Sequence, residues 1–247
     1  MENQKTTVLS RAVPRRTVLK GGVIAAGVLG MPAIVKAKPI EMRLHHFNSP
    51  LALSQKGFLL PWAKKIEEDS HGAIQIKVFP AMQLGGKPKD LYGQVRDGVV
   101  DIIWTIPGYT ANRFHLTEVF ELPFVTKSAE ITAPAIQEFA LKHFQKEYAD
   151  THPILFHSHP PGNIHTAHVP VRKLEDLKGL RLRGPSRPIT EALHAMGAVP
   201  VSMPVPAVTE AVVHGMAAIT MGNATVMERK GIARKSHAQH AHTCCQR

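Results

Sequence analysis

The chain has 247 residues, enough for one or two folded domains, and its formal net charge at pH 7 is +11. The excess positive charge lies at the two ends, because residues 1–37 carry a net +5 and residues 214–247 a net +4, which leaves +2 for the middle. A nearly balanced middle without arginines interleaved with aromatic residues argues against nucleic acid as a partner.

Residues 1–37 have the features of an export signal. Arg15-Arg16 lie in the segment PRRTVLK, which resembles the twin-arginine pattern S/T-R-R-x-F-L-K with Pro14 and Val18 as departures. The apolar stretch 21–35 is shorter than the roughly 20 residues that span a bilayer. The segment ends in Val35-Lys36-Ala37, which predicts cleavage after Ala37, an uncleaved anchor being the alternative. We therefore expect the folded protein to be exported to the periplasm.

Strands and helices alternate along the middle of the chain, which predicts an α/β fold. The expected strands are 40–47, 73–79, 99–105, 154–159, 163–169, 180–183 and 198–202. The expected helices are 53–70, 90–97, 129–150, 186–196 and 205–213. Pro61 should kink or break the first helix. The nearly continuous apolar run at 99–105 predicts a strand buried on both faces.

Arg183 stands at the end of the predicted strand LRLR, just before Gly184 opens the next helix. Alternation places Arg181 and Arg183 on the face opposite the leucines. Ligands bind at the carboxyl ends of strands in α/β sheets, and a guanidinium fixed there can hold a carboxylate through two parallel hydrogen bonds. The alternative is a solvated surface arginine.

Five segments, in this order, resemble the DctP-like substrate-binding proteins of TRAP transporters. They are VFPAMQLGG (78–86), GQVRDGVVDIIWT (93–105), VFELPFV (119–125), LEDLKGLRLRGPSRPITEA (174–192) and AMGAVPVSMPVPAVTEAVVHG (195–215). The resemblance implies a two-lobed, type II periplasmic-binding-protein-like fold. It also implies a receptor that closes on a small organic acid, with Arg183 as the carboxylate clamp, and that delivers the acid to TRAP membrane subunits.

The resemblance divides the chain into a first lobe at 38–155, a partial second lobe at 156–215 and a tail at 216–247. Family members continue past the position of Gly215 with further strands and a long helix. The tail here has no sustained apolar period, so we expect it to be disordered and the second lobe to be incomplete. A reading-frame shift near codon 215 is the preferred explanation, and a natural short variant is the alternative.

Three residues of the first lobe are candidates for ligand contact. Trp104 ends a predicted strand, and Tyr109 follows in a Pro-Gly-Tyr loop that can face the cleft. An indole or a phenol there can pack against a carbon skeleton and donate a hydrogen bond. His46, near the end of the first strand, is the third candidate. Core packing is the alternative for each of them.

Histidines cluster in HSHPPGNIHTAH, which spans residues 157–168. Alternate histidines on a strand suit a metal, but the cluster holds no carboxylate and Pro160-Pro161-Gly162 break the strand. We therefore expect no metal, and we favour Asn163 and His165 as ligand-contacting side chains. Both cysteines, Cys244 and Cys245, lie in the tail, so the middle has no disulfide framework.

No nucleophile, metalloprotease or phosphate-loop motif is present, so we expect neither an enzyme nor a cofactor. Three interpretations of function remain open. The first is a periplasmic receptor for a small organic acid, the second a histidine-dependent metal-binding protein, and the third a shortened, non-functional receptor.

Overall fold

The computed structural model describes residues 38–122, 124–159, 162–166, 170–214 and 217–221. All of them except Lys38 belong to one compact unit, Pro39–Arg247. The predicted export signal at 1–37 lies outside the described residues. No helix in the described ranges is both long enough and apolar enough to cross a bilayer.

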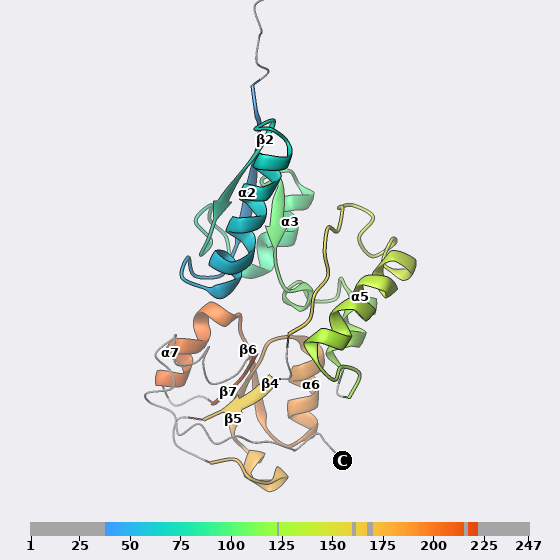
Figure 1. Cartoon of the computed structure of the whole chain (residues 1–247). Coiled ribbons are helices and arrows are strands. Elements are labelled where there is room, and N and C mark those ends of the chain that lie inside the picture. The colour runs from blue at the N-terminus through green and yellow to red at the C-terminus, as the bar shows by residue number, and fades with distance from the viewer. Residues whose placement is uncertain (1–37, 123, 160–161, 167–169, 215–216, 222–247) are drawn as a thin grey trace, which may run out of the picture. The chain divides into compact units, whose positions relative to one another are not determined.

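The first sheet is parallel and has the strand order β2-β1-β3. Its strands are β1 (Ile40–His46), β2 (Ile74–Phe79) and β3 (Ile102–Trp104). Helix α2 (Leu60–Asp69) follows β1 and packs on β2, and α3 (Leu91–Arg96) precedes β3 (Figure 1). Because parallel strands end at the same edge, His46 lies directly beside Trp104.

Pro61 was expected to kink or break the first helix, but the helix does not end there. A π-helical turn at Gln55–Leu59 continues directly into the regular helix α2 at Leu60. The backbone of Leu59 and Leu60 stays in the right-handed helical region, so the helix changes type before Pro61 without a break.

The predicted strand at 99–105 is shorter in the structure and only half-buried. Val99 is exposed, and the carboxylate of Asp101 accepts hydrogen bonds from the backbone and side chain of Arg43. Residues 99–101 form bends that follow the turn at 97–98, and β3 begins only at Ile102. In the described sheet β3 is an edge strand, which explains why the two-sided burial expected from its composition is absent.

Two other predicted elements of this half also differ. Helix α5 (Ala129–His143) ends earlier than expected, and residues 154–159 form no strand. The first hydrophobic core lies between α5 and its neighbours and is mainly aromatic, with α4 (His115–Glu118) beside it. Its buried members are Tyr92, Phe114, Ile136, Ala140, Phe144 and Tyr148.

The second sheet is mixed and has the strand order β4-β7-β5-β6. Its strands are β4 (Gly162–His165), β5 (Arg181–Gly184), β6 (Val199–Ser202) and β7 (Ala217–Met221). Helix α6 (Arg187–Ala195) packs on β5 and β6, and α7 (Val208–Val213) precedes β7 (Figure 1). The sheet has its own core, formed by Val171, Leu177, Leu182, Leu193 and Ala198.

The described chain also contains short 3-10 helices, two of which directly precede α3 and α7. These short helices are Pro88–Asp90, Pro107–Tyr109, Val119–Glu121, Leu174–Leu177 and Val205–Ala207. The predicted turn at Gly179 is present, with a φ of 74° that glycine adopts without strain.

Strand β7 corrects the expectation of a disordered tail that begins at residue 216. Residues Ala217–Met221 pair antiparallel with β4 and parallel with β5, so they fill an interior position of the second sheet. Residues Ala217–Met221 are a short run of small and apolar residues without sustained alternation between apolar and polar side chains. The sequence therefore did not indicate a strand there. The remainder of the predicted tail, 222–247, lies outside the described residues.

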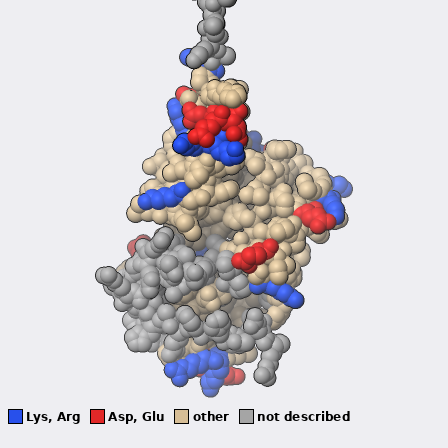
Figure 2. Space-filling view, viewed as in Figure 1, with Lys and Arg blue, Asp and Glu red and all other residues tan. Residues whose placement is uncertain are grey.

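Charged side chains of both signs lie next to one another on the face shown in Figure 2. The structure has exposed ion pairs between Lys64 and Glu68, Lys65 and Asp69, and Lys77 and Glu41. Pairs of this kind add little stability. They do prevent a field of a single sign from developing over this part of the surface.

Candidate functional site

Arg183 is completely buried, which excludes the alternative of a solvated surface arginine. Its Nε donates to the backbone oxygen of Met203 at 2.8 Å, and its Nη2 donates to the Tyr109 hydroxyl at 3.4 Å. Arg181, two residues earlier on the same strand, is exposed. Burial lowers the pKa of Arg183, whereas its interaction with the neighbouring Tyr109 raises it. A carboxylate beside this guanidinium would offset the cost of burying its charge.

The turn from β5 into α6 positions Arg183 and has room only for glycine at residue 184. A Cβ on Gly184 would lie 2.6 Å from Thr190 Oγ1 and 3.2 Å from Thr190 Cα. Thr190 in turn donates its hydroxyl hydrogen to the Ser186 carbonyl. The close approach lets α6 start immediately after the strand, so that Arg183 stands at the carboxyl end of β5.

Tyr109 connects the first half of the chain to the arginine. Its phenol oxygen accepts hydrogen bonds from Arg183 Nη2 and from the backbone N–H of Val205 at 3.0 Å. Burial raises the pKa of Tyr109, so the phenol stays protonated at neutral pH. Both lone pairs are therefore in use, and the remaining hydrogen has no acceptor among the described residues. The phenol is suited to donate this hydrogen to an oxygen bound beside Arg183.

A row of aromatic rings extends from Tyr109 to His157. The ring centroids of Tyr109 and Phe47 are 5.3 Å apart, and those of Phe47 and Trp104 are 5.4 Å apart. The indole N–H of Trp104 then donates to Nε2 of His157 at 2.9 Å. Phe47 is buried, whereas Trp104 and Tyr109 are half-buried and His157 is exposed. The row therefore offers an apolar surface next to a buried cation, which suits an amphipathic organic acid.

His46 lies behind this row, fully buried. Its Nδ1 accepts the backbone N–H of Asn48, so its Nε2 carries the hydrogen that is donated to Gln55 Oε1. Burial also lowers the pKa of His46, which keeps the ring neutral. Both nitrogens of His46 are engaged and its ring lies edge-on to Trp104, so His46 supports the indole. That His46 contacts the ligand remains a prediction.

The two candidates from the second lobe lie on β4. Asn163 is exposed and pairs in register with Thr220, and His165 is buried and pairs with Ala218. That either side chain contacts the ligand remains a prediction. His168 lies outside the described residues.

The histidine cluster does not assemble a metal centre in the part of the chain that the structure describes. No group of three histidine, cysteine, aspartate or glutamate side chains comes together there as a metal ion would require. The Nε2 lone pair of His157 accepts the indole hydrogen of Trp104, so this nitrogen is engaged within the protein.

A second contact joins the segment around Tyr109 to the start of α6. A Cβ on Gly108 would lie 2.7 Å from Ser186 Cβ and 2.8 Å from Glu121 Oε1. Burial raises the pKa of Glu121, and the nearby negative charge of Glu118 raises it further. A hydrogen bond with the Ser186 hydroxyl lowers it. Glu118 also lies 3.7 Å from the guanidinium of Arg187, in α6. These carboxylates therefore belong to the packing around Tyr109.

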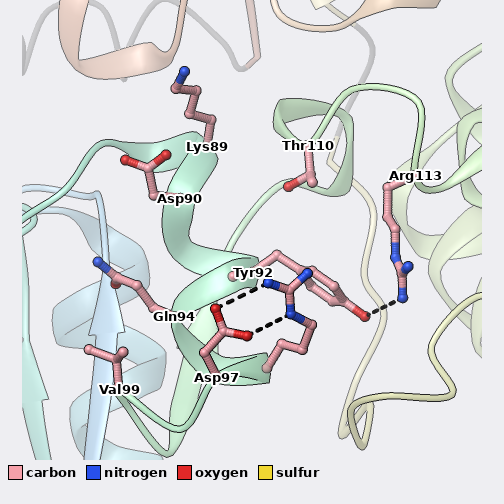
Figure 3. A pocket seen from close by; sticks show the side chains of 10 residues that line it. Lys89, Asp90, Tyr92, Gln94, Asp97, Val99, Thr110 and Arg113 are labelled. Carbon is pink, nitrogen blue, oxygen red and sulfur yellow. Dashed lines mark hydrogen bonds and ion pairs between the residues drawn. The ribbon is translucent and has the colours of Figure 1, made fainter.

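A separate hollow of about 430 Å³ lies beside α3 (Figure 3). Neither Arg183, Trp104 nor His157 lines it. Its two arginines already have carboxylate partners, since Arg96 pairs with Asp97 and Arg113 pairs with Asp150. The charge of both arginines is thus balanced by carboxylates of the protein.

Several residues of this site were not predicted from the sequence. Phe47 gave a signal, because it immediately follows β1 and therefore lies at the edge where the parallel strands end. His157 was considered only as a metal ligand, since nothing in the sequence indicates that its partner is Trp104. Glu121, Met203 and Val205 contribute through contacts across long sequence separations, which no local pattern reveals.

The sequence and the structure both match known proteins. Residues 44–236 match the sequence profile of the bacterial extracellular solute-binding protein family 7, DctP. A TRAP solute-binding protein from a marine metagenome, specific for aromatic acid ligands and solved with metahydroxyphenylacetate, is 40% identical with a TM-score of 0.76. The match covers 80% of this chain and 62% of that one.

Two further solute-binding proteins also match most of this chain and part of their own length. A TRAP solute-binding protein from Rhodoferax ferrireducens T118, solved with copurified benzoate, is 40% identical with a TM-score of 0.75, over 80% of this chain and 61% of that one. The ectoine/5-hydroxyectoine-binding periplasmic protein UehA of Ruegeria pomeroyi is 25% identical over 195 residues, which are 74% of this chain and 54% of UehA. The chain thus spans about half to six-tenths of the length of these relatives.

This chain belongs to the bacterial extracellular solute-binding protein family 7. The predicted DctP-like family and the two-lobed, type II periplasmic-binding-protein fold are confirmed. The match continues to residue 236, past Gly215, where the sequence analysis placed the end of the resemblance. The family is one of solute-binding proteins located outside the cytoplasm, which agrees with the expectation of a receptor in place of an enzyme.

Proposed function

We propose that this protein is the periplasmic receptor of a TRAP-type transporter and that it binds a small aromatic carboxylic acid. The observation that carries the proposal is the buried guanidinium of Arg183 at the carboxyl end of β5, beside the phenol of Tyr109. This pair provides a fixed cation and a hydroxyl donor at one point. A carboxylate is the group that such a pair recognises best.

The aromatic row supplies the other half of the recognition. Trp104, which is linked to Tyr109 through the buried ring of Phe47, gives the carbon skeleton of the ligand an apolar surface. The two solved relatives at 40% identity were crystallised with metahydroxyphenylacetate and benzoate, which are aromatic monocarboxylates. Their ligands support an aromatic acid here in preference to an aliphatic dicarboxylate.

A bound carboxylate would contact both Tyr109 and Arg183 and would stabilise the arrangement in which these two residues already meet. Because the ligand interacts with both residues only in that arrangement, it favours the closed state. The closed receptor would then deliver the acid to the membrane subunits of the transporter. We place this cycle in the periplasm, after export by the twin-arginine-like signal.

A thermal-shift experiment on the full chain tests the proposal. Benzoate should raise the unfolding midpoint in a concentration-dependent way, because a ligand that binds only the folded state stabilises it by mass action. Benzamide has the same ring but no charge, and it should leave the midpoint unchanged. Equal shifts with both compounds, or no shift with benzoate and with a panel of other organic acids, would contradict the proposal.

A further inference from the structure

The indole of Trp104 and the imidazole of His157 form one nearly flat surface. Their ring planes differ by 12° and their centroids are 5.6 Å apart. An indole N–H bond lies in the plane of its ring, so the 2.9 Å hydrogen bond along it places Nε2 of His157 close to that plane. The two rings therefore extend each other sideways into a plate larger than either ring alone.

The plate is supported from the protein side. Phe47, which is 3% exposed, packs against Trp104, and buried His46 meets the indole edge-on with centroids 6.5 Å apart. Trp104 itself is half-buried and His157 is exposed. The supporting residues are thus fixed, while part of the plate stays accessible to a ligand.

The hydrogen bond also specifies the state of the histidine. An indole nitrogen can only donate, so Nε2 of His157 must present a lone pair and the ring proton must reside on Nδ1. Although His157 is exposed as a whole residue, desolvation of its ring by the surrounding protein lowers its pKa, and a hydrogen bond with the backbone of Ser158 raises it. The titratable group on the opposite side of the indole is His46, whose ring is neutral for the reasons given above.

We propose that His157 is the positioning residue that determines selectivity for planar rings, by holding the Trp104 indole in the orientation that a ligand ring stacks on. This inference rests on the proposed binding of a carboxylic acid and adds to it the residue that discriminates among acids. Without the acceptor at Nε2, the indole can rotate about its side-chain torsions and the flat surface is lost. A flat ligand ring then loses its stacking partner and binds more weakly, whereas a puckered ring, which does not stack, keeps most of its affinity.

The experiment compares two probes of similar size and equal charge, benzoate and cyclohexanecarboxylate, by calorimetry on the full chain. His157→Phe keeps a flat ring but removes the acceptor, and it should weaken benzoate binding about five- to tenfold, the loss expected for one hydrogen bond. Cyclohexanecarboxylate binding should change by less than about twofold. His157→Gln retains an acceptor oxygen and should restore most of the selectivity. His152→Gln, a change at an exposed histidine of the same segment, is the matched control and should have no effect.

The pH dependence provides a readout that a purely structural role would not alter. As the pH falls below the ordinary histidine pKa of about 6.5, in the range where carboxylic acids stay ionised, the wild-type preference for benzoate should fall because His157 is protonated and loses its lone pair. The His157→Gln variant cannot titrate, so its preference should stay constant over this range. Equal losses for both acids in His157→Phe, or unchanged affinities, would overturn the inference. Absence of any acid binding by the wild type would instead refute the proposed function on which it rests.

Discussion

Tyr109 and Arg183 are 74 residues apart in the sequence, yet the phenol oxygen of Tyr109 accepts a hydrogen bond from the Arg183 guanidinium at 3.4 Å. The same oxygen accepts the backbone N–H of Val205, so one side chain orders both the buried cation and the segment after β6. This contact places a hydroxyl donor and a cation at one point before any ligand arrives. Such preorganisation reduces the entropy that binding would otherwise cost.

Tyr109→Phe should reveal the value of that hydroxyl. The variant keeps the ring contact with Phe47 but leaves the N–H of Val205 without its acceptor. We expect a loss of about 1–3 kcal/mol in unfolding free energy, the range for an unsatisfied buried donor. We also expect weaker binding of benzoate, because the hydrogen that the phenol donates is lost. Urea titration and calorimetry measure the two effects, and unchanged values in both would remove Tyr109 from the site.

Gly108→Ala should disturb the contact between the Tyr109 segment and α6. The new Cβ would lie 2.7 Å from Ser186 Cβ, closer than side chains approach, and relieving the overlap should cost about 1–3 kcal/mol. The matched control is Gly93→Ala in α3, where nothing lies within 4 Å of the new Cβ. That change should stabilise the protein by about 0.5–1 kcal/mol, because alanine favours a helix. Urea titration of both variants checks the prediction, and a Gly108→Ala variant as stable as the wild type would contradict the close packing.

Glu121 should make stability depend on pH. Burial raises its pKa in the folded state above the ordinary carboxyl value of the unfolded chain, so the folded state binds more protons between these two values. The free energy of unfolding should therefore fall as pH rises through this window and stay lower at neutral pH. Glu121→Gln removes the titration and should be more stable than the wild type at pH 7.

The comparison of Glu121→Gln with the wild type needs unfolding curves across the acidic range. Glu138→Gln serves as the control, because Glu138 is exposed on α5 and pairs only with the neighbouring Lys142. Its pH profile should follow that of the wild type. A Glu121→Gln profile that also follows the wild type would show that the buried carboxyl does not produce the effect.

Local sequence signals predicted the elements that depend on local chemistry. The turn at Gly179 and the strand that carries Arg183 both follow from backbone preferences and alternation. Strand β7 was missed because it is held by pairing with β4 and β5, which lie far away in sequence. Pairing partners of that kind leave no periodicity in the segment itself.

The candidate site shows the same division. Arg183, Trp104 and Tyr109 were recognisable because each ends a strand or follows one, at the edge where α/β proteins bind ligands. The role of His46 could not be predicted, since it depends on which atoms its two nitrogens meet. The partnership of His157 with Trp104 likewise depends on a contact over 53 residues.

The central claim, that Arg183 holds the carboxylate of the ligand, is tested most directly by calorimetric titration of benzoate into the wild type and Arg183→Lys. Lysine keeps the charge but loses the two-pronged geometry, so binding should weaken by about 1.5–3 kcal/mol, which is more than tenfold. Arg181→Lys, an exposed position on the same strand, should leave the affinity unchanged. Equal affinities for the wild type and a folded Arg183→Lys variant would contradict the account.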